Sequence, residues 1–274
     1  MRRAALEVRA KLIGMLMQPE CHAANHILQC LALAGGGDVL AAFVELEKHP
    51  RAWAKKLNAP PSVYAHAGGW TFDKNGNLVV LNFGTCYPVF PVTETRKADP
   101  AVSVAQPRED ICTGCGTRLM DVLRIDADDG RLSFLGTSGI ITATVCPNCA
   151  PVCERTDVRY TLDGGATMEV VEPWPDQWKM PEGEYAAMTG KKYALAPNPE
   201  PVFYPRGLGE STVTIGGFAD WIQGFQYKTC PDCRKTMHYL ASVPWAALSD
   251  YSEGDLYLEI CTDCRVISAF HQQT

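Results

Sequence analysis

Four pairs of cysteines constrain this 274-residue chain more than any other feature. The two cysteines of each pair are separated by two residues, so a tight turn can direct both thiolates at one ion. Two such turns complete a tetrahedral site with Zn–S distances of about 2.3 Å. The pairs therefore predict two zinc ions with eight protein ligands, which are Cys112, Cys115, Cys146, Cys149, Cys230, Cys233, Cys261 and Cys264.

The order of the pairs along the chain favours one way of grouping them. Thirty residues separate Cys115 from Cys146, which is enough for a two- or three-stranded excursion, and the two late pairs also enclose a strand-forming segment. Closing a short loop costs less entropy than closing a long one. We therefore predict that each site uses two successive pairs. An interleaved grouping, which joins the first pair to a late pair, is also sterically open.

Metal binding accounts for the cysteines better than disulfide bonds do. Eight of the twelve cysteines fall into the spaced pairs, and a chain of this length with 46% hydrophobic residues can bury a core without covalent staples. Iron–sulfur ligation is the main alternative, but the ribbon spacing suits a mononuclear tetrahedral ion. Because cysteines fill all four positions, no open position is left to activate water, and the zinc is expected to be structural.

The sequence shows no sign of export or of membrane insertion. Glu7, Arg9 and Lys11 interrupt the apolar residues near the N-terminus, and no apolar run is long enough to span a bilayer. We therefore expect a reducing, cytoplasmic setting and no membrane partner. The net charge of −6, without a Lys/Arg run longer than two, argues against a nucleic-acid partner.

Residues 1–59 are predicted to be a helical segment that resembles part of a helical-repeat protein. Apolar residues recur there at helical spacing, with a second helix over about 21–34 and Asp38 as the N-cap of a third. His22 and His26 share one helix face without a metalloprotease motif, so we expect both to be exposed to solvent.

Residues 60–274 are predicted to be a β-rich, zinc-binding domain, which makes the chain an α+β protein. Pro60-Pro61 and the polar stretch Thr93–Glu109 are interpreted as linkers. Asp73–Gly76 has the Asn-Gly signature of a hairpin turn between apolar runs. Further strands are predicted over 119–125, 131–135, 139–145, 158–162, 168–171, 237–243, 256–260 and 266–270.

Several other residues qualify as candidates for binding or chemistry. Cys30 and Cys86 are predicted to be small buried residues, with a reactive thiol or an extra metal ligand as the alternatives for Cys86. Cys153 follows Cys149 closely enough to compete as a ligand. In a Pro-rich connection, Trp174 and Trp178 are expected to anchor the loop in the core. His238 and His271 lie near the second site, but four cysteines already fill it, so structural roles are predicted.

The C-terminal block carries the matches to a known family. Its sequences Ile215-Gly216-Gly217, Asp220-Trp221-Ile222-Gln223, Tyr239-Leu240-Ala241 and Gly254-Asp255-Leu256-Tyr257-Leu258 resemble the YwqG-like family of bacterial proteins over about 210–270. That resemblance implies a β-rich α+β fold with no established active site. It also implies a partner-binding role, because such domains occur in toxin–immunity systems.

These observations favour a cytoplasmic, zinc-stabilised protein-binding module over an enzyme. The resemblance implies an immunity protein that neutralises a bacterial toxin by direct binding, and the acidic balance suits a basic toxin surface. One alternative is a nucleic-acid-associated protein in which Trp221, Phe225 and Tyr227 stack on bases, although acidic residues crowd this ribbon. The other is an enzyme that uses Cys86, although no phosphate-binding, nucleophile-elbow or metalloprotease motif is present.

Overall fold

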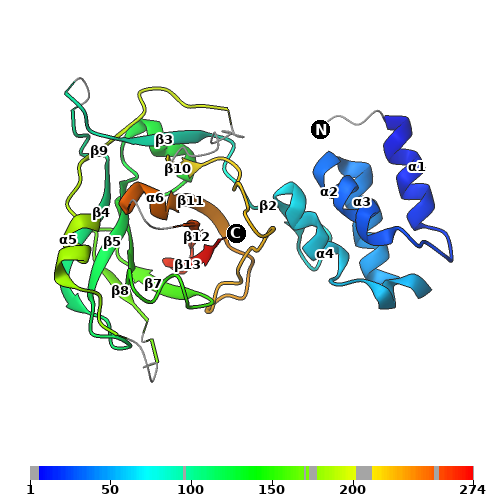
Figure 1. The fold of residues 1–274 in the computed structure, drawn as a ribbon. Coiled ribbons are helices and arrows are strands. Elements are labelled where there is room, and N and C mark those ends of the chain that lie inside the picture. The colour runs from blue at the N-terminus through cyan, green and yellow to red at the C-terminus, as the bar shows by residue number, and fades with distance from the viewer. Residues whose placement is uncertain are drawn as a thin grey trace. The chain divides into compact units, whose positions relative to one another are not determined.

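A computed structural model describes residues 6–94, 97–169, 171–172, 178–201, 212–249 and 253–273 of the chain. It divides into two compact units (Figure 1). The first ends at Asn82 and includes Gly224–Gln226, and the second contains the rest of the chain from Phe83 onward. Helices dominate the first unit and strands the second, so the predicted α+β class, with helices preceding a β-rich domain, is confirmed. Among the described residues, no helix combines the length and apolar character needed to cross a membrane.

The helical unit is held together by apolar residues from its three long helices. Leu28, Leu31 and Phe43 are fully buried, and the Phe43 ring lies 5.4 Å from that of Trp70. Its elements are α1 (Leu6–Leu16), α2 (Ala24–Ala34), α3 (Gly37–Lys48), η1 (Ala52–Lys56), α4 (Pro61–Tyr64), η2 (Ala65–Gly68), β1 (Trp70–Phe72) and β2 (Leu78–Val80).

Two predictions for the helical unit are wrong. Asp38 does not cap α3: Gly36 holds the cap position, and Asp38 lies in the first turn with an ion pair to Arg9 at 3.2 Å. Pro60-Pro61 is not a linker, because Pro61 begins α4, as a proline without an N–H can at a helix start. The hydroxyl of Ser62 then donates to Glu47 at 2.9 Å, so the helical unit extends past the predicted boundary at residue 59.

Other predictions for this unit concern its hairpin and its polar side chains. The hairpin at Asp73–Gly76 is confirmed, since β1 and β2 pair antiparallel with Trp70 opposite Val80. His22 and His26 are exposed, as predicted. Cys30 is exposed rather than buried, because it lies on the face of α2 opposite the apolar stripe.

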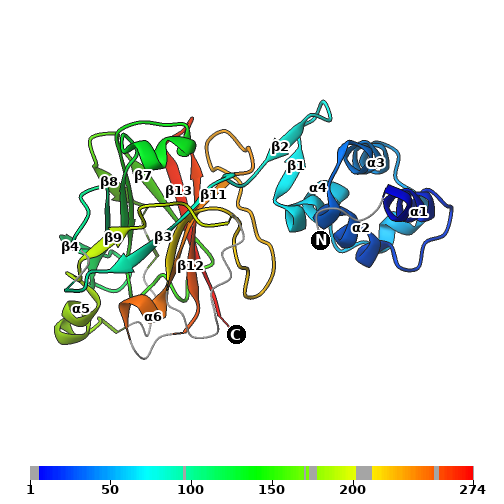
Figure 2. The ribbon, with the colours of Figure 1, turned by 90° about the horizontal axis from the view of Figure 1, so that it is seen from above.

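The second unit contains two sheets, an eight-stranded one in the order β8-β7-β13-β12-β11-β10-β3-β9 and a three-stranded one in the order β4-β5-β6. Figure 2 shows β7, β13, β12 and β11 as neighbouring strands. The elements are β3 (Cys86–Pro91), β4 (Val102–Ile111), β5 (Arg118–Asp126), η3 (Gly130–Leu135), β6 (Ile140–Val145), β7 (Thr156–Tyr160), β8 (Ala166–Met168), α5 (Glu182–Met188), β9 (Tyr193–Leu195), β10 (Val213–Gly216), β11 (His238–Pro244), α6 (Trp245–Leu248), β12 (Asp255–Cys261) and β13 (Val266–Gln272).

The two sheets enclose one apolar core. Leu258 and Ile267 of the large sheet belong to the same buried cluster as Leu123 and Ile141 of the small one. Hydrogen bonds also join the sheet edges, since Ile140 N donates to Leu162 O at 2.8 Å on one side. On the other side, Gly190 N donates to Ala105 O at 3.1 Å. The small sheet therefore closes over one face of the large sheet.

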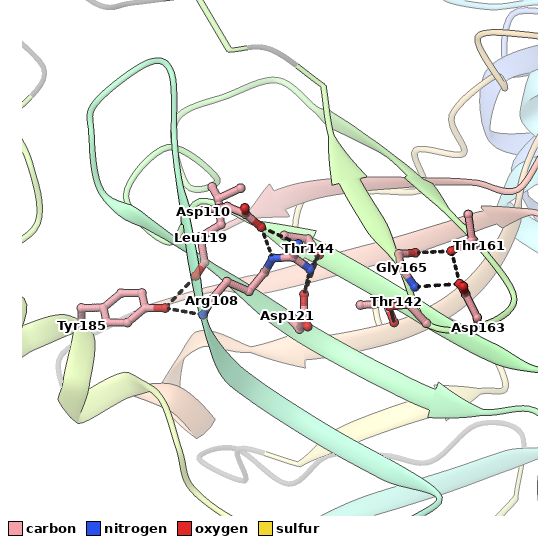
Figure 3. Close-up of polar contacts among 11 residues, drawn as sticks. Arg108, Asp110, Leu119, Asp121, Thr142, Thr144, Thr161, Asp163, Gly165 and Tyr185 are labelled. Carbon is pink, nitrogen blue, oxygen red and sulfur yellow. Dashed lines mark hydrogen bonds and ion pairs between the residues drawn. The ribbon is translucent and has the colours of Figure 1, made fainter.

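The polar stretch 93–109 is not a linker, because β4 begins within it at Val102. An antiparallel sheet with one face on the core leaves the other face polar. Figure 3 shows the result: the Arg108 guanidinium lies 2.9 Å from Asp121, which also accepts from Thr144 Oγ1 at 2.6 Å. Tyr185, which belongs to the buried apolar cluster, donates to Leu119 O at 2.6 Å.

The strand predicted over 131–135 is also wrong. This segment is η3, and the carboxylate of Asp129 accepts from Arg131 N at 2.9 Å at its start. The Arg131 guanidinium lies 2.7 Å from both Asp129 and Asp99. This pair joins the segment to a residue 32 positions away in the sequence. Of the strand predicted over 168–171, Met168 alone belongs to a strand, β8; positions 169 and 171 do not, and position 170 lies outside the described residues. The remaining predicted strands overlap β5, β6, β7, β11, β12 and β13.

Candidate metal centres

The first centre lies at one end of the three-stranded sheet. Cys112 and Cys115 occupy the turn between β4 and β5, and Cys146 and Cys149 directly follow β6. Because β5 pairs antiparallel with both neighbours, the end of β6 lies beside the start of β5, as the pairing of Met120 with Val145 shows. Sheet topology therefore brings the two turns together.

The second centre repeats this arrangement on the large sheet. Cys230 and Cys233 precede β11, Cys261 is the last residue of β12, and Cys264 lies in the turn to β13. The start of β11 pairs with the end of β12, so both turns lie at the same end of the strand pair. Each Cys-x-x-Cys turn thus stands where a strand begins or ends.

The sulfur positions fit a tetrahedral ion. Within each group of four, the ligand atoms lie within 4.8 Å of one another. The sulfurs of Cys112 and Cys149 are 3.6 Å apart, and those of Cys233 and Cys261 are 3.7 Å apart. A tetrahedron with Zn–S arms of about 2.3 Å has S–S edges of about 3.8 Å, whereas a disulfide requires about 2.05 Å.

The groups are the sequential ones and not the interleaved ones. All of these cysteines are free thiols, and soft thiolates are donors that zinc accepts. The donor set and its spacing therefore fit two metal ions. The role of the eight cysteines as ligands and the identity of the metal remain predictions.

The backbone of the turns follows one pattern. In three of the four turns, the residue after the second cysteine has a positive φ: 73° at Gly116, 61° at Arg234 and 55° at Arg265. Gly116 N then donates back to Cys112 O at 2.9 Å, and Arg234 N to Cys230 O at 3.1 Å. This left-handed residue ends the turn, and it strains arginine more than glycine.

The electrostatics of the thiols favour a bound cation. A hydrogen bond from Cys146 lowers the pKa of Cys112 to about 5, and the same contact raises the pKa of Cys146. In the second centre, the backbone N–H of Lys235 lowers the pKa of Cys233, whereas burial raises that of Cys261. In each centre, one thiolate is thus stabilised while the pKa of a neighbouring thiol is raised. Only a bound cation can balance the negative charge of four thiolates.

A fifth thiol lies beside the first centre. Cys153 packs against the buried cluster of Cys112, Cys146, Cys149 and Leu119. Its N–H donates to Cys149 O at 2.9 Å, and burial raises the pKa of its thiol. It does not belong to the group of four whose ligand atoms converge.

Aromatic rings pack on the outer face of the large sheet near the second centre. The Trp221 ring lies 4.7 Å from Tyr257 and 6.1 Å from Phe270, and Tyr257 donates to Asp220 O at 2.6 Å. Tyr227 is buried beside Trp221. Trp221 and Tyr227, two of the three aromatic residues considered for base stacking, therefore pack against other rings of this chain.

The remaining candidates lie outside both groups of four. Cys86 is buried on β3, as predicted. His271 contacts Glu253 O at 3.0 Å, and the ring of His238 lies 6.1 Å from that of Phe83. Trp178 is 60% exposed, so its predicted burial is wrong, and Trp174 lies outside the described residues.

A row of buried polar groups on the large sheet is absent from the sequence-based predictions. Glu259, Ser268 and Asp157 stand opposite one another on β12, β13 and β7, and all three are buried. One oxygen of Glu259 accepts from Lys228 N at 2.6 Å, the other has no hydrogen-bond partner among the described residues, and burial raises the pKa of this carboxyl. Glu259 lies between the core residues Leu258 and Ile260 on β12. Because successive side chains of a strand point to opposite faces, this position predicts that Glu259 faces away from the core.

Comparisons with known proteins add one relative. The chain is 27% identical over 283 aligned positions to the uncharacterized protein YpfL of Salmonella typhimurium (strain LT2). The alignment covers 99% of this chain and 64% of YpfL, so the chain spans less than two thirds of that relative's length. No protein-family model matches the chain, and no solved structure matches it.

Proposed function

We propose that this chain is a zinc-stabilised protein-binding module without catalytic activity of its own. The observation that carries the proposal is the closed character of the two centres. Each supplies four convergent thiols to an ion that takes four ligands, which leaves no position for water or substrate. Zinc in such a site contributes folding free energy and performs no chemistry.

The position of the centres supports this role. The first centre joins strand ends of the three-stranded sheet, and the second joins strand ends of the eight-stranded sheet. Metal binding and formation of the sheets are therefore linked. Rigid scaffolds of this kind commonly present loops for recognition. The candidate for covalent catalysis, Cys86, is buried.

The specific form of binding that we propose is neutralisation of a basic bacterial toxin, in a cytoplasmic setting. Its supports are the YwqG-like resemblance over about 210–270 and the net charge of −6, which favours fast association with a basic surface. The relative YpfL is uncharacterized and gives no information on this point.

The test is affinity capture with the full chain from its source organism, with metals quantified on the same sample. We expect two zinc ions per chain and one stoichiometric protein partner. Two zinc ions with no partner, or with bound nucleic acid instead, would contradict the protein-binding role while leaving the structural centres intact.

A further inference from the structure

A pocket of about 350 Å³ opens beside the first centre. Two of its lining residues, Cys153 and Val171, also pack against the cysteines of that centre. The hydroxyl of Thr113, in the first Cys-x-x-Cys turn, donates to Val171 O at 3.1 Å. The metal centre therefore helps to fix one wall of the pocket.

Acidic side chains outnumber basic ones in the lining of the pocket. Its lining includes four carboxylates, those of Glu154, Asp157, Glu169 and Glu172, and one guanidinium, that of Arg155, which gives a net charge of −3. The carboxylate of Asp157 is 5% exposed and pairs with Arg155, which also donates to Thr229 O at 3.0 Å.

The outer carboxylates differ from this inner pair because they are accessible. Glu154, Glu169 and Glu172 are exposed, and Glu169 lies 3.6 Å from Arg159. Focused negative potential at a concave surface attracts cations. The pocket therefore combines a fixed, paired interior with accessible negative charge outside it.

Large apolar side chains are exposed on segments that lie next to the cysteine turns of the first centre. Ile111 is 64% exposed and directly precedes Cys112, and Val152 is 52% exposed in the turn that follows Cys149. Trp178 is 60% exposed, and its carbonyl accepts from Asn148 Nδ2 at 2.6 Å. Val152 directly precedes Cys153 of the pocket lining, and the other two side chains lie on segments next to the cysteine turns of the same centre.

We propose that the pocket and these three apolar side chains form the docking surface for a basic segment of a protein partner, with a lysine or arginine side chain in the pocket. The inference rests on the protein-binding function proposed above. A guanidinium can donate to two carboxylate oxygens at once. The apolar neighbours of the basic residue then contact Ile111 and Val152.

A bare metal ion suits the pocket less well than a basic side chain. A metal requires several ligand atoms close together, and among the described residues only the two cysteine groups bring three or more such atoms together. The pocket's carboxylates do not converge in this way, whereas a long basic side chain can reach between separated acids.

The test uses two synthetic peptides in which basic positions alternate with leucines. One carries arginine, and the other carries citrulline, which is neutral and of nearly the same shape. Fluorescence anisotropy measures the affinity of both peptides for the full zinc-loaded chain. The variants are Glu154→Gln/Glu172→Gln in the pocket, Val152→Ser beside it, and Glu184→Gln/Glu200→Gln as a control, because these two glutamates are exposed outside the pocket.

We expect the pocket variant to bind the arginine peptide about tenfold more weakly, with a smaller salt dependence, while the matched control keeps the affinity of the wild type. Val152→Ser should weaken both peptides to a similar degree. Equal affinity of the wild type for the two peptides, or equal losses in the pocket and control variants, would overturn the proposal. Since no native partner is present in this assay, such a result would leave the capture experiment for the proposed function unaffected.

Discussion

The two metal centres share a ligand set and a turn geometry, but they stand in different surroundings. The first closes one end of a three-stranded sheet, with a pocket, a fifth thiol and exposed apolar side chains around it. The second closes an inner strand pair of an eight-stranded sheet and lies near a packed aromatic cluster. We propose on this basis that the second centre mainly supports the fold, whereas the first also shapes the docking surface proposed above.

The largest difference is expected from removing one thiolate at each centre. Cys261→Ser and Cys112→Ser should each reduce the zinc content from two ions to one, because serine is a poor substitute for a thiolate ligand. Cys261→Ser should destabilise the chain more, since Cys261 ends β12 between β11 and β13. The expected loss is about 3–5 kcal/mol of unfolding free energy or complete unfolding, measured by urea denaturation.

The control for both substitutions is Cys30→Ser, which changes an exposed cysteine outside the centres. It should retain two zinc ions and the stability of the wild type. If Cys261→Ser also kept full zinc content and normal denaturation, the second centre would have no structural role.

How far the sequence predicts these centres depends on whether the signal is local. A Cys-x-x-Cys turn is a property of four consecutive residues, so each turn could be located, and loop closure favoured the grouping that the structure has. The alternating runs that became β5, β6 and β12 carried their own signal in the same way.

Features that depend on distant partners were not predictable. Residues 131–135 have strand-like composition, yet the ion pair of Arg131 with Asp99 stabilises a 3₁₀ helix there. The polar β4 resembles a linker because its outer face carries the Arg108–Asp121 pair. The pocket beside the first centre is lined by residues 153–157 together with Glu169, Val171 and Glu172, so no single run of sequence predicts it.

The aromatic cluster provides the second test of the comparison. Trp221→Ala removes a half-buried ring that contacts Tyr257, Phe270 and Tyr227, and we expect a loss of about 2–4 kcal/mol. Trp178→Ala, on the first centre's surface, should change stability by less than about 0.5 kcal/mol because that ring is 60% exposed. Thermal denaturation of both variants measures the contrast, and equal losses would remove the proposed division between support and surface.

The helical unit should respond to pH through a residue unrelated to metal. Burial lowers the pKa of His66 to about 4, below the usual 6.5 of histidine. Its neutral form therefore stabilises the fold fully above pH 6.5, and this contribution is lost as the pH falls toward 4. The loss amounts to about 3 kcal/mol at most.

Urea denaturation from pH 4 to pH 7 measures this effect as the difference between the wild type and His66→Gln. This difference in unfolding free energy should change across that range. The variant His22→Gln, at an exposed position, should show no such change relative to the wild type. A pH-independent difference between His66→Gln and the wild type would show that His66 is not the titrating group.

The smallest effects are expected in the turns themselves. Gly116→Ala places a side chain at φ 73° where no described residue beyond its two chain neighbours lies within 4 Å, so the expected loss of about 1 kcal/mol is conformational. Arg234→Gly relieves the same strain in the second centre and should raise stability by up to about 1 kcal/mol. Calorimetry on the zinc-loaded proteins should show melting shifts of opposite sign, and shifts of the same sign would contradict this interpretation.

The central claim is that both ions are closed in by four thiolates, and zinc X-ray absorption spectroscopy on the full chain tests it most directly. We expect a first shell of four sulfur atoms at about 2.3 Å and no nitrogen or oxygen ligand. A shell that contains an oxygen or nitrogen atom would reveal an open or mixed site and contradict the non-catalytic role. A spectrum with iron in place of zinc would contradict the metal assignment itself.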